Sequence, residues 1–161
     1  MIDVEPLLEV QRSSYAAASD GLRAAWPEWQ ALEDAGMASL LEVNRYCVLA
    51  TARLDGRAHA APVAFVVSEG SFWIATLPGL RLRNLQSTPW ASVVVMDGVA
   101  DEGEEGATHR ALTAEGPVVL HEPAVLARFE KQWLERHTDA PDWAEVFIEL
   151  RPQRIFSHAA G

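Results

Sequence analysis

The chain divides into two parts by the spacing of its apolar residues. In the first quarter, apolar positions such as Leu22 and Trp29 recur at roughly helical intervals, with breaks at Gly21 and Pro27. This spacing predicts one or two helices. We therefore expect residues 1–44 to form a helical N-terminal extension of the domain that follows.

The next segment shows the short apolar runs and turn residues of β structure. Asp55-Gly56 is a strong signal for a two-residue hairpin turn. Pro62 cannot donate a backbone hydrogen bond, so it indicates an edge position or a bulge in its strand. The predicted strands span residues 46–53, 57–68, 72–76 and 90–96, and one short helix spans residues 80–87.

A polar segment separates this region from the last third of the chain. Residues 97–106 are acidic and rich in glycine, which predicts a solvated loop. Residues 107–121 then have the composition of a strand, and Gly116-Pro117 predicts an interruption within it.

The C-terminal segment adds one helix and one strand. Glu122-Pro123 is a typical helix start, and the predicted apolar face consists of Val125, Leu126, Phe129, Trp133 and Leu134. Val146, Ile148 and Leu150 recur at every second position, so residues 146–150 are predicted to be the final strand. Short consecutive strands with two inserted helices predict a mainly β fold with flanking helices, arranged as an antiparallel barrel.

Composition limits the class of protein. The 161 residues have the usual length of one domain, so we expect residues 1–161 to form a single domain. No apolar stretch has the length of a transmembrane helix, which predicts a soluble protein. The single cysteine, Cys47, lies in an apolar run and is interpreted as a buried small residue. Without a possible internal disulfide or a secretory signal, we expect a cytoplasmic protein.

Charge is distributed unevenly along the chain. Thirteen basic and 23 acidic residues give a net charge of −10, which argues against binding to nucleic acid or to anionic membranes. No carboxylate occurs from Gly70 to Met96, however, and Arg81 and Arg83 lie within this gap at the start of the predicted helix. A helix N-terminus attracts anions through its unpaired N–H groups. The segment therefore predicts a local anion site, unless the two arginines are merely solvated.

Several short motifs lie between residues 46 and 95, in the run YCVLATARLDGRAHAAPVAFVVSEGSFWIATLPGLRLRNLQSTPWASVVV. They are the turn Asp55-Gly56-Arg57, the pair Pro62-Val63, the strand Phe72 to Thr76, the triplet Arg83-Asn84-Leu85, and Pro89. With these motifs the segment resembles the flavin-binding split-barrel family typified by pyridoxamine 5′-phosphate oxidase. The first 40 residues have no such resemblance.

The resemblance implies a six-stranded antiparallel split β-barrel of the FMN-binding type. Members of the family are usually homodimers with two cofactors at the subunit interface. By resemblance, the flavin ring would lie against two strands, at Ala60, Ala61, Pro62, Val63, Ala75 and Thr76. The phosphate would be held at the following turn and helix, by Arg81, Arg83 and Asn84.

The phosphate motif departs from the family pattern. Many members carry Ser-Arg-Lys-x-Arg, where this chain has Gly79 and Leu80 in place of the serine and the first arginine. Arg53, the region of Arg110 or a partner subunit could supply the missing charge. A different cofactor is the other explanation, since related split-barrel proteins bind an 8-hydroxy-5-deazaflavin or haem.

The resemblance implies an FMN-binding oxidoreductase that acts on a small organic substrate. The alternatives are a deazaflavin-dependent reductase and a non-catalytic module that binds a flavin or haem. We assign no catalytic residue, because the ring of a flavin itself carries the electrons. His59 lies beside the predicted ring-facing strand, although a lone histidine is more often structural. The other histidines show no metal-ligand spacing, so we assign no metal.

Trp73 differs from the other tryptophans in its predicted position. Alternation places it opposite Phe72 and Ile74, and therefore outside the barrel wall. An outward tryptophan indicates a surface that is covered by a partner. We expect the remaining tryptophans to lie in the core or at an interface.

Overall fold

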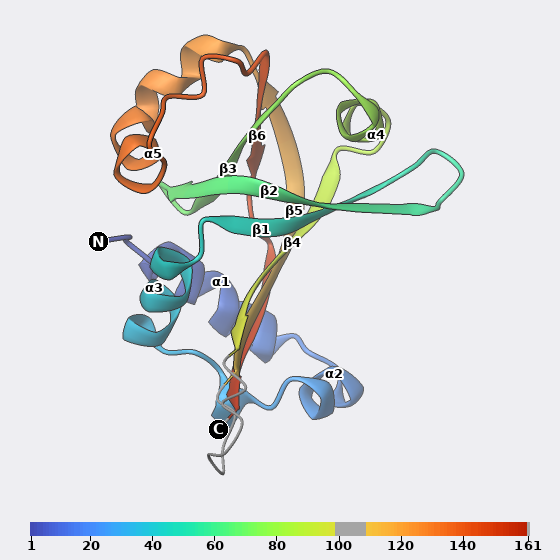
Figure 1. Cartoon of the computed structure of the whole chain (residues 1–161). Coiled ribbons are helices and arrows are strands. Elements are labelled where there is room, and N and C mark those ends of the chain that lie inside the picture. Colours follow the sequence, from blue (N-terminus) through green and yellow to red (C-terminus); the bar gives the residue numbers. More distant parts are fainter. Residues whose placement is uncertain (99–108, 161) are drawn as a thin grey trace.

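The computed structural model describes residues 1–98 and 109–160, and its strands form an antiparallel sheet that closes into a barrel (Figure 1). The strands are β1 (Tyr46–Ala52), β2 (Ala58–Ser68), β3 (Ser71–Thr76), β4 (Trp90–Gly98), β5 (His109–His121), β6 (Val146–Leu150) and β7 (Arg154–Ala160). The barrel runs in the order β4-β1-β2-β3-β6-β5 and closes because β4 also pairs with β5, while β7 adds to β5. The predicted six-stranded antiparallel barrel is confirmed.

β5 contacts three other strands along its length. Its first half pairs with β4 and β7, and residues 118–121 pair with β6. At Gly116 its backbone approaches the connection between β6 and β7 closely, because a Cβ atom there would lie 2.0 Å from the carbonyl oxygen of Arg151. The predicted interruption at Gly116-Pro117 is therefore wrong: the strand continues through this pair, which lies at the change of neighbours.

The barrel is split between β2 and β3. Residues 58–64 of β2 pair with β1, whereas β3 pairs with β2 only at residues 65–68 of β2. One edge of the first segment is thus free of strand partners among the described residues. Pro62 lies on this segment, which confirms its predicted edge position and fits its lack of a backbone donor.

Helices at the N-terminus close one end of the barrel (Figure 1). They are α1 (Glu5–Ala16), α2 (Asp20–Ala25) and α3 (Asp34–Val43), with a short 3-10 turn at Glu28–Gln30. Leu7, Met37 and Leu40 are fully buried and belong to the same apolar cluster as the barrel interior. The sequence predicted one or two helices, which is too few, because residues 1–44 contain three helices and a 3-10 turn. The apolar residues Leu40 and Leu41 of α3 are fully buried, so tertiary packing stabilises this ten-residue helix.

A second apolar cluster covers the outer side of β3 and β6. It is built by a 3-10 turn (Pro123–Arg128) and α5 (Glu130–Arg136), which pack Phe129 and Trp133 against Trp73 and Phe147. Trp73 is 1 % exposed and stacks on Phe129 with 4.5 Å between ring centroids. Its outward position is confirmed, but the expected partner surface is wrong, because Phe129 and Trp133 of the same chain cover it.

The helix predicted after residue 121 is interrupted at Phe129, where the backbone leaves helical geometry at φ −139°. The two helical pieces therefore do not share one continuous apolar face. Leu134, predicted to lie on that face, is 48 % exposed. The prediction for Leu134 is wrong, while Phe129 and Trp133 are buried as predicted.

The end of the chain contains two strands rather than one. Residues 146–150 form β6 as predicted, and β7 follows after a turn that contains Pro152. The predicted acidic loop begins inside β4, since Asp97 and Gly98 are strand residues, and the rest of it lies outside the described residues. Across residues 1–98 and 109–160, no helix is long and apolar enough to span a membrane.

A buried carboxylate links three strands next to Trp73. Glu149 on β6 accepts hydrogen bonds from Ser71 at 3.1 Å and Arg151 at 2.9 Å, and its other contact is His121 at 2.7 Å. Burial alone would raise the pKa of Glu149, but these hydrogen bonds outweigh it and hold the pKa below its usual range. The ionised carboxylate therefore ties β3, β5 and β6 together.

Candidate functional site

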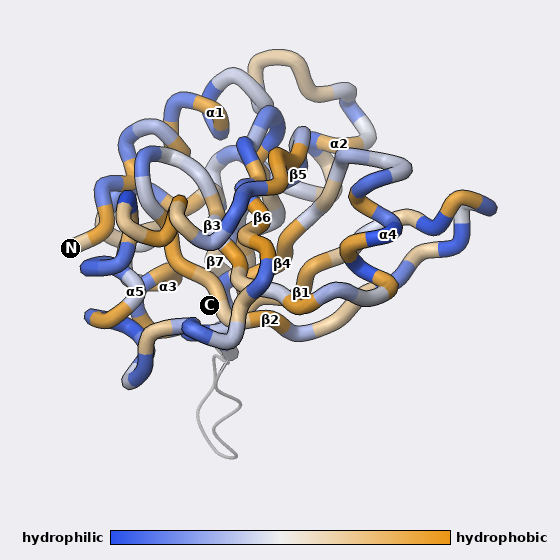
Figure 2. The backbone as a smooth tube through the Cα atoms, turned by 90° about the horizontal axis from the view of Figure 1, so that it is seen from above, coloured by the Kyte–Doolittle hydropathy of each residue, from blue (hydrophilic) through white to orange (hydrophobic). Residues whose placement is uncertain are grey.

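The candidate site lies where β3 ends and α4 (Leu80–Ser87) begins, beside the β1–β2 hairpin. Figures 1 and 2 both show α4 next to this hairpin, which extends away from the barrel. The hairpin turns at Gly56, whose φ of 84° favours glycine. A hydrogen bond from the buried Asn84 side chain to the Thr51 hydroxyl, 3.0 Å long, fixes α4 against β1. The N-terminus of α4 is thereby held over the split in the barrel.

The first of two adjoining cavities, the Arg81 cavity, has a volume of about 410 Å³. Its walls come from β2, the end of β3, the start of α4 and the loop before β6. The lining residues are His59, Ala75, Thr76, Leu77, Gly79, Leu80, Arg81 and Trp143. It therefore contains the predicted ring-contacting residues of β3 together with one of the predicted phosphate ligands.

Two side chains of the Arg81 cavity carry buried nitrogen atoms without hydrogen-bond partners among the described residues. They are Nε of Arg81 and Nδ1 of His59. A terminal nitrogen of Arg81 donates to the Thr76 hydroxyl at 3.0 Å, which holds the guanidinium against the end of β3. Burial lowers the pKa of Arg81. A buried donor without a partner costs about 1–3 kcal/mol, so the cavity favours a ligand that accepts hydrogen bonds.

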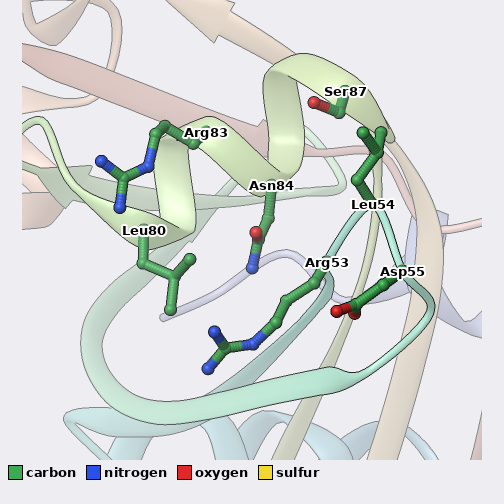
Figure 3. A pocket seen from close by; sticks show the side chains of 7 residues that line it. All are labelled: Arg53, Leu54, Asp55, Leu80, Arg83, Asn84 and Ser87. Carbon is green, nitrogen blue, oxygen red and sulfur yellow. The ribbon is translucent and has the colours of Figure 1, made fainter.

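The second cavity, the Arg83 cavity, lies on the hairpin side of α4 and has a volume of about 440 Å³ (Figure 3). Its lining residues are Arg53, Leu54, Asp55, Leu80, Arg83, Asn84 and Ser87. Leu80 lines both cavities. In Figure 3, Leu80 and Asn84 point from α4 towards the hairpin, and Arg53 reaches from the hairpin towards Leu80.

The predicted ring-contacting residues of β2 face in two directions. Val63 is buried in the barrel core and Ala61 is half-buried, whereas Ala60 and Pro62 are exposed on the outer face. His59 shares the inner face with Ala61 by strand alternation. The structure therefore brings the inner face of β2 to the Arg81 cavity through His59, and the four predicted residues do not form one surface.

The predicted phosphate ligands are likewise divided between the cavities. Arg81 lines the first cavity, while Arg83 and Asn84 line the second. Successive odd positions on a helix are about 200° apart, which explains why the two arginines point to different sides. Of the residues considered as compensation, Arg53 lies in the Arg83 cavity. Arg110 does not reach either cavity and instead binds Asp97 and Ser39.

Sequence reasoning did not assign Trp143 to the site. This residue is 55 % exposed and lines the Arg81 cavity from the loop before β6. It is placed there by the pairing of β3 with β6, which sets Val146 opposite Thr76. Because these strands are 70 residues apart in the sequence, no local pattern indicates the contact.

Cys47 and the histidines do not add a reactive or metal site. Cys47 is buried as predicted, and burial raises the pKa of its thiol to about 12, which keeps it protonated. In the described part of the chain, no group of three or more histidine, cysteine, aspartate or glutamate side chains is arranged to hold a metal ion. The site is thus defined by arginines, a histidine and small residues at a free strand edge.

The described strands thus form a split barrel, and α4 begins beside its free strand edge. The chain belongs to the pyridoxamine 5′-phosphate oxidase family, whose model matches residues 34–159. The match includes α3, β1 to β6 and all but the last residue of β7, so the predicted membership is confirmed. No match to this chain is found among curated protein sequences.

Solved structures of low sequence identity share the fold. An FAD-binding protein from Mesorhizobium loti is 20 % identical, with a TM-score of 0.65 over 82 % of this chain and 96 % of that one. A conserved hypothetical protein from Mycobacterium tuberculosis is 24 % identical, with a TM-score of 0.68 over 83 % and 88 %. A haem storage protein from Vibrio cholerae is 14 % identical, with a TM-score of 0.61 over 80 % and 96 %.

Proposed function

We propose that this protein is an oxidoreductase that binds a flavin through its phosphate and acts on a small organic substrate. FMN is the simplest flavin that satisfies the site. The observation that carries the proposal is the pair of unpartnered buried nitrogen atoms on Arg81 and His59, whose side chains line one cavity. A phosphate oxygen accepts a hydrogen bond from Nε of Arg81 and neutralises the guanidinium, and Nδ1 of His59 donates to it in the tautomer that carries the proton there.

The residues of the Arg81 cavity fit a flavin phosphate. Arg81 is positioned by Thr76, and the preceding Gly79 carries no side chain that would obstruct the N–H groups at the start of α4. The helix N-terminus adds a partial positive charge. Arg83 and Asn84, in the adjoining cavity, remain proposed cofactor ligands.

The free edge of β2 supports the location of the ring. Backbone N–H and C=O groups at an unpaired edge are available to hydrogen-bond a planar heterocycle. Ala60 and Ala61 have small side chains, so a ring can approach this backbone closely. A bound flavin would supply the transfer of hydride or electrons, while the protein positions the ring and excludes water.

The non-catalytic alternative is supported by the fold shared with a haem storage protein. The proposed oxidoreductase and the non-catalytic module would both use the Arg81 cavity and the free edge of β2, and they differ in the ligand that they bind. Flavin absorbance of the purified protein would support the proposed function, whereas a Soret band would support haem. A deazaflavin remains the alternative cofactor within the same cleft.

We expect Arg81→Ala to weaken FMN binding by roughly tenfold to a hundredfold, because one charge-assisted hydrogen bond to the phosphate is lost. Titration of the quenching of flavin fluorescence measures this dissociation constant. Riboflavin lacks the phosphate, so its binding should be the same for the variant and the native protein. Arg12→Ala is the matched control, because Arg12 lies on α1 and pairs with Glu5 on the surface. Unchanged FMN affinity in Arg81→Ala would place the phosphate elsewhere.

We also propose that the protein is a homodimer with the cofactor sites near its interface. The outer faces of β1, β2 and β4 form an apolar surface, the β1 face, which is not covered by any part of the described chain. Its members are Tyr46, Val48, Ala60, Pro62, Val94 and Met96. Strand pairing sets Pro62, Val48 and Val94 side by side, and an uncovered apolar patch of this kind is typical of an interface.

Sedimentation velocity tests the homodimer. We expect a dimer at micromolar concentration, and Val48→Lys should shift it to monomer because a buried lysine at the centre of the β1 face would lack a partner. Leu134→Lys is the control, since Leu134 is comparably exposed on α5, outside this face. A native protein that sediments as a monomer would contradict the proposed interface.

A further inference from the structure

A third cavity, the Ser68 cavity, lies at the opposite end of β3 from the proposed flavin site. Its walls come from the residues before α1, the end of α3, the turn between β2 and β3, and α5. Figures 1 and 2 both show the N-terminus on the side of the barrel that carries α3 and α5. The volume is about 480 Å³, which is in the usual range for pockets that bind small molecules.

Carboxylates from four separate segments line the Ser68 cavity. They are Asp3, Glu42, Glu69 and Glu135. Glu69 is closely paired, with Arg128 at 2.5 Å. Glu42 and Glu135 meet only the exposed N-terminal amino group and the exposed Lys131, each at 3.8 Å, and such exposed pairs contribute little stability. Asp3 has no cationic partner within residues 1–98 and 109–160. Three of the four carboxylates are therefore available to an added cation.

The single arginine of the cavity does not neutralise these carboxylates. The terminal nitrogens of Arg136 donate to the backbone carbonyl oxygens of Leu41 and Asn44, at the end of α3. The C-terminal end of a helix carries a partial negative charge, which offsets the charge of the guanidinium. Arg136 also lies over the ring of Phe65 at 5.0 Å. The cavity as a whole therefore attracts positive charge.

Ser68 supplies an independent sign of a ligand. It is 8 % exposed, and its hydroxyl forms no hydrogen bond with another described residue, whereas its carbonyl oxygen accepts one from Trp73. Strand alternation places the side chain on the same face of β2 as Val66, which packs in the cluster beneath α5. The hydroxyl is not sealed from solvent, so it points into the cavity that the residue lines. A hydroxyl held in this way favours a ligand that forms hydrogen bonds.

The walls of the Ser68 cavity are fixed without a ligand. The backbone N–H of Ile2 donates to Glu42 at 3.0 Å, which ties the N-terminal residues to α3. The turn between β2 and β3 touches the start of α1, because a Cβ atom on Gly70 would lie 2.8 Å from Cβ of Pro6. The carboxylates on these segments consequently keep their spacing, and a ligand does not have to order them.

We infer that the Ser68 cavity binds a linear polyamine. Its ammonium groups donate to Asp3 and Glu42 on the N-terminal side and to Glu135 on the side of α5, and the Ser68 hydroxyl accepts a further hydrogen bond. An ammonium group has up to three donors and no acceptor, which matches a cavity of carboxylates and a hydroxyl. The site is separate from the Arg81 cavity, so the inference does not depend on the proposed function.

A chain of methylene groups between the charges fits the rest of the lining. Ile2 and Val67 give the cavity apolar surface, which a compact inorganic cation would not use. A metal ion also lacks a site here, since in the described part of the chain no three histidine, cysteine, aspartate or glutamate side chains are grouped to hold one. Ammonium groups spaced along an alkyl chain instead reach carboxylates that lie apart.

Calorimetric titration with spermidine tests the polyamine site. We expect the native protein to bind one equivalent, and Asp3→Asn and Glu135→Gln each to weaken binding by about threefold to tenfold, because each removes one charge-assisted contact. The double variant should lose about tenfold to a hundredfold. Asparagine keeps the oxygen that accepts from the Glu5 N–H, and circular dichroism checks that the fold is retained. Ser68→Ala should also weaken binding.

Two controls separate the site from the general attraction of cations to an acidic protein. Glu130→Gln removes an exposed carboxylate from α5 outside the cavity lining and should leave spermidine affinity unchanged. The neutral 1,8-octanediol, of similar length, should not bind. Equal losses in Glu130→Gln and Glu135→Gln would overturn the inference, because spermidine would then respond to net charge alone.

The remaining outcomes are also decisive. Absence of saturable spermidine binding to the native protein at millimolar concentration would overturn the inference, and so would undiminished binding in the double variant. Arg81→Ala should bind spermidine as tightly as the native protein, and Asp3→Asn with Glu135→Gln should bind FMN as the native protein does. Loss of either activity therefore leaves the other standing.

Discussion

Gly116→Ala is expected to lower the free energy of unfolding by about 3 kcal/mol or more. The added Cβ would lie 2.0 Å from the carbonyl oxygen of Arg151 and 3.0 Å from the backbone nitrogen of Gln153. Neither atom can move away easily, because Arg151 donates its N–H to Pro117 and Gln153 donates its N–H to Glu115. These two hydrogen bonds bracket Gly116, so the clash must displace the connection between β6 and β7.

Thermal unfolding measures the effect. A loss of about 3 kcal/mol corresponds to a fall in Tm of roughly 6–12 °C for a chain of this length. Gly21→Ala is the matched control, because Gly21 lies in α2 with no atom within 4 Å of the added Cβ, and alanine favours a helix over glycine. The control should leave Tm unchanged or raise it slightly. A Tm for Gly116→Ala within 2 °C of native would show that the β6–β7 connection relaxes freely.

Local patterns predicted those parts of the fold that depend on neighbours in the sequence. The strand at residues 46–53 and the short helix at residues 80–87 are each determined by a few adjacent residues, and the structure has both, as β1 and α4. The hairpin after β1 was also predicted, but its two-residue turn at Asp55-Gly56 is wrong, because the last strand pair is Ala52 with Ala58 and five residues connect the strands. Gly116 shows the limit of such patterns. A glycine before a proline is an ordinary turn signal, and only the packing of a distant connection turns it into a close-approach position in a continuous strand.

The candidate site likewise has some features that local sequence determines and others that depend on long-range contacts. The proposed anion site at the start of α4 rests on a carboxylate gap and a helix N-terminus, both of which are local, and it stays a prediction. Helix geometry alone sets Arg81 and Arg83 about 200° apart, but which cavity each one lines depends on how α4 is rotated against β1, and the Asn84–Thr51 hydrogen bond fixes that contact. The contribution of Trp143 depends on a strand pairing between distant segments. These long-range contacts have no signature in a single sequence.

Trp73→Ala is expected to cost about 3–5 kcal/mol, or roughly 6–20 °C in Tm. Trp73 is 1 % exposed, stacks on Phe129 and donates its indole N–H to the carbonyl oxygen of Ser68 at 3.3 Å. Arg128 lies over its ring at 5.1 Å. Removal of the indole would leave a cavity between the barrel wall and α5, and thermal unfolding followed by circular dichroism measures the loss.

Two further substitutions isolate the cause. Trp29→Ala removes a tryptophan that is 83 % exposed and should change stability by no more than about 0.5 kcal/mol. Trp73→Phe keeps a ring against Phe129 but removes the indole donor, so its cost should fall between those of Trp29→Ala and Trp73→Ala.

Ala75 belongs to the same apolar cluster as Trp73 and also lines the Arg81 cavity. Trp73→Ala should therefore also weaken flavin binding, and unchanged stability with unchanged binding would show that α5 packs independently of β3.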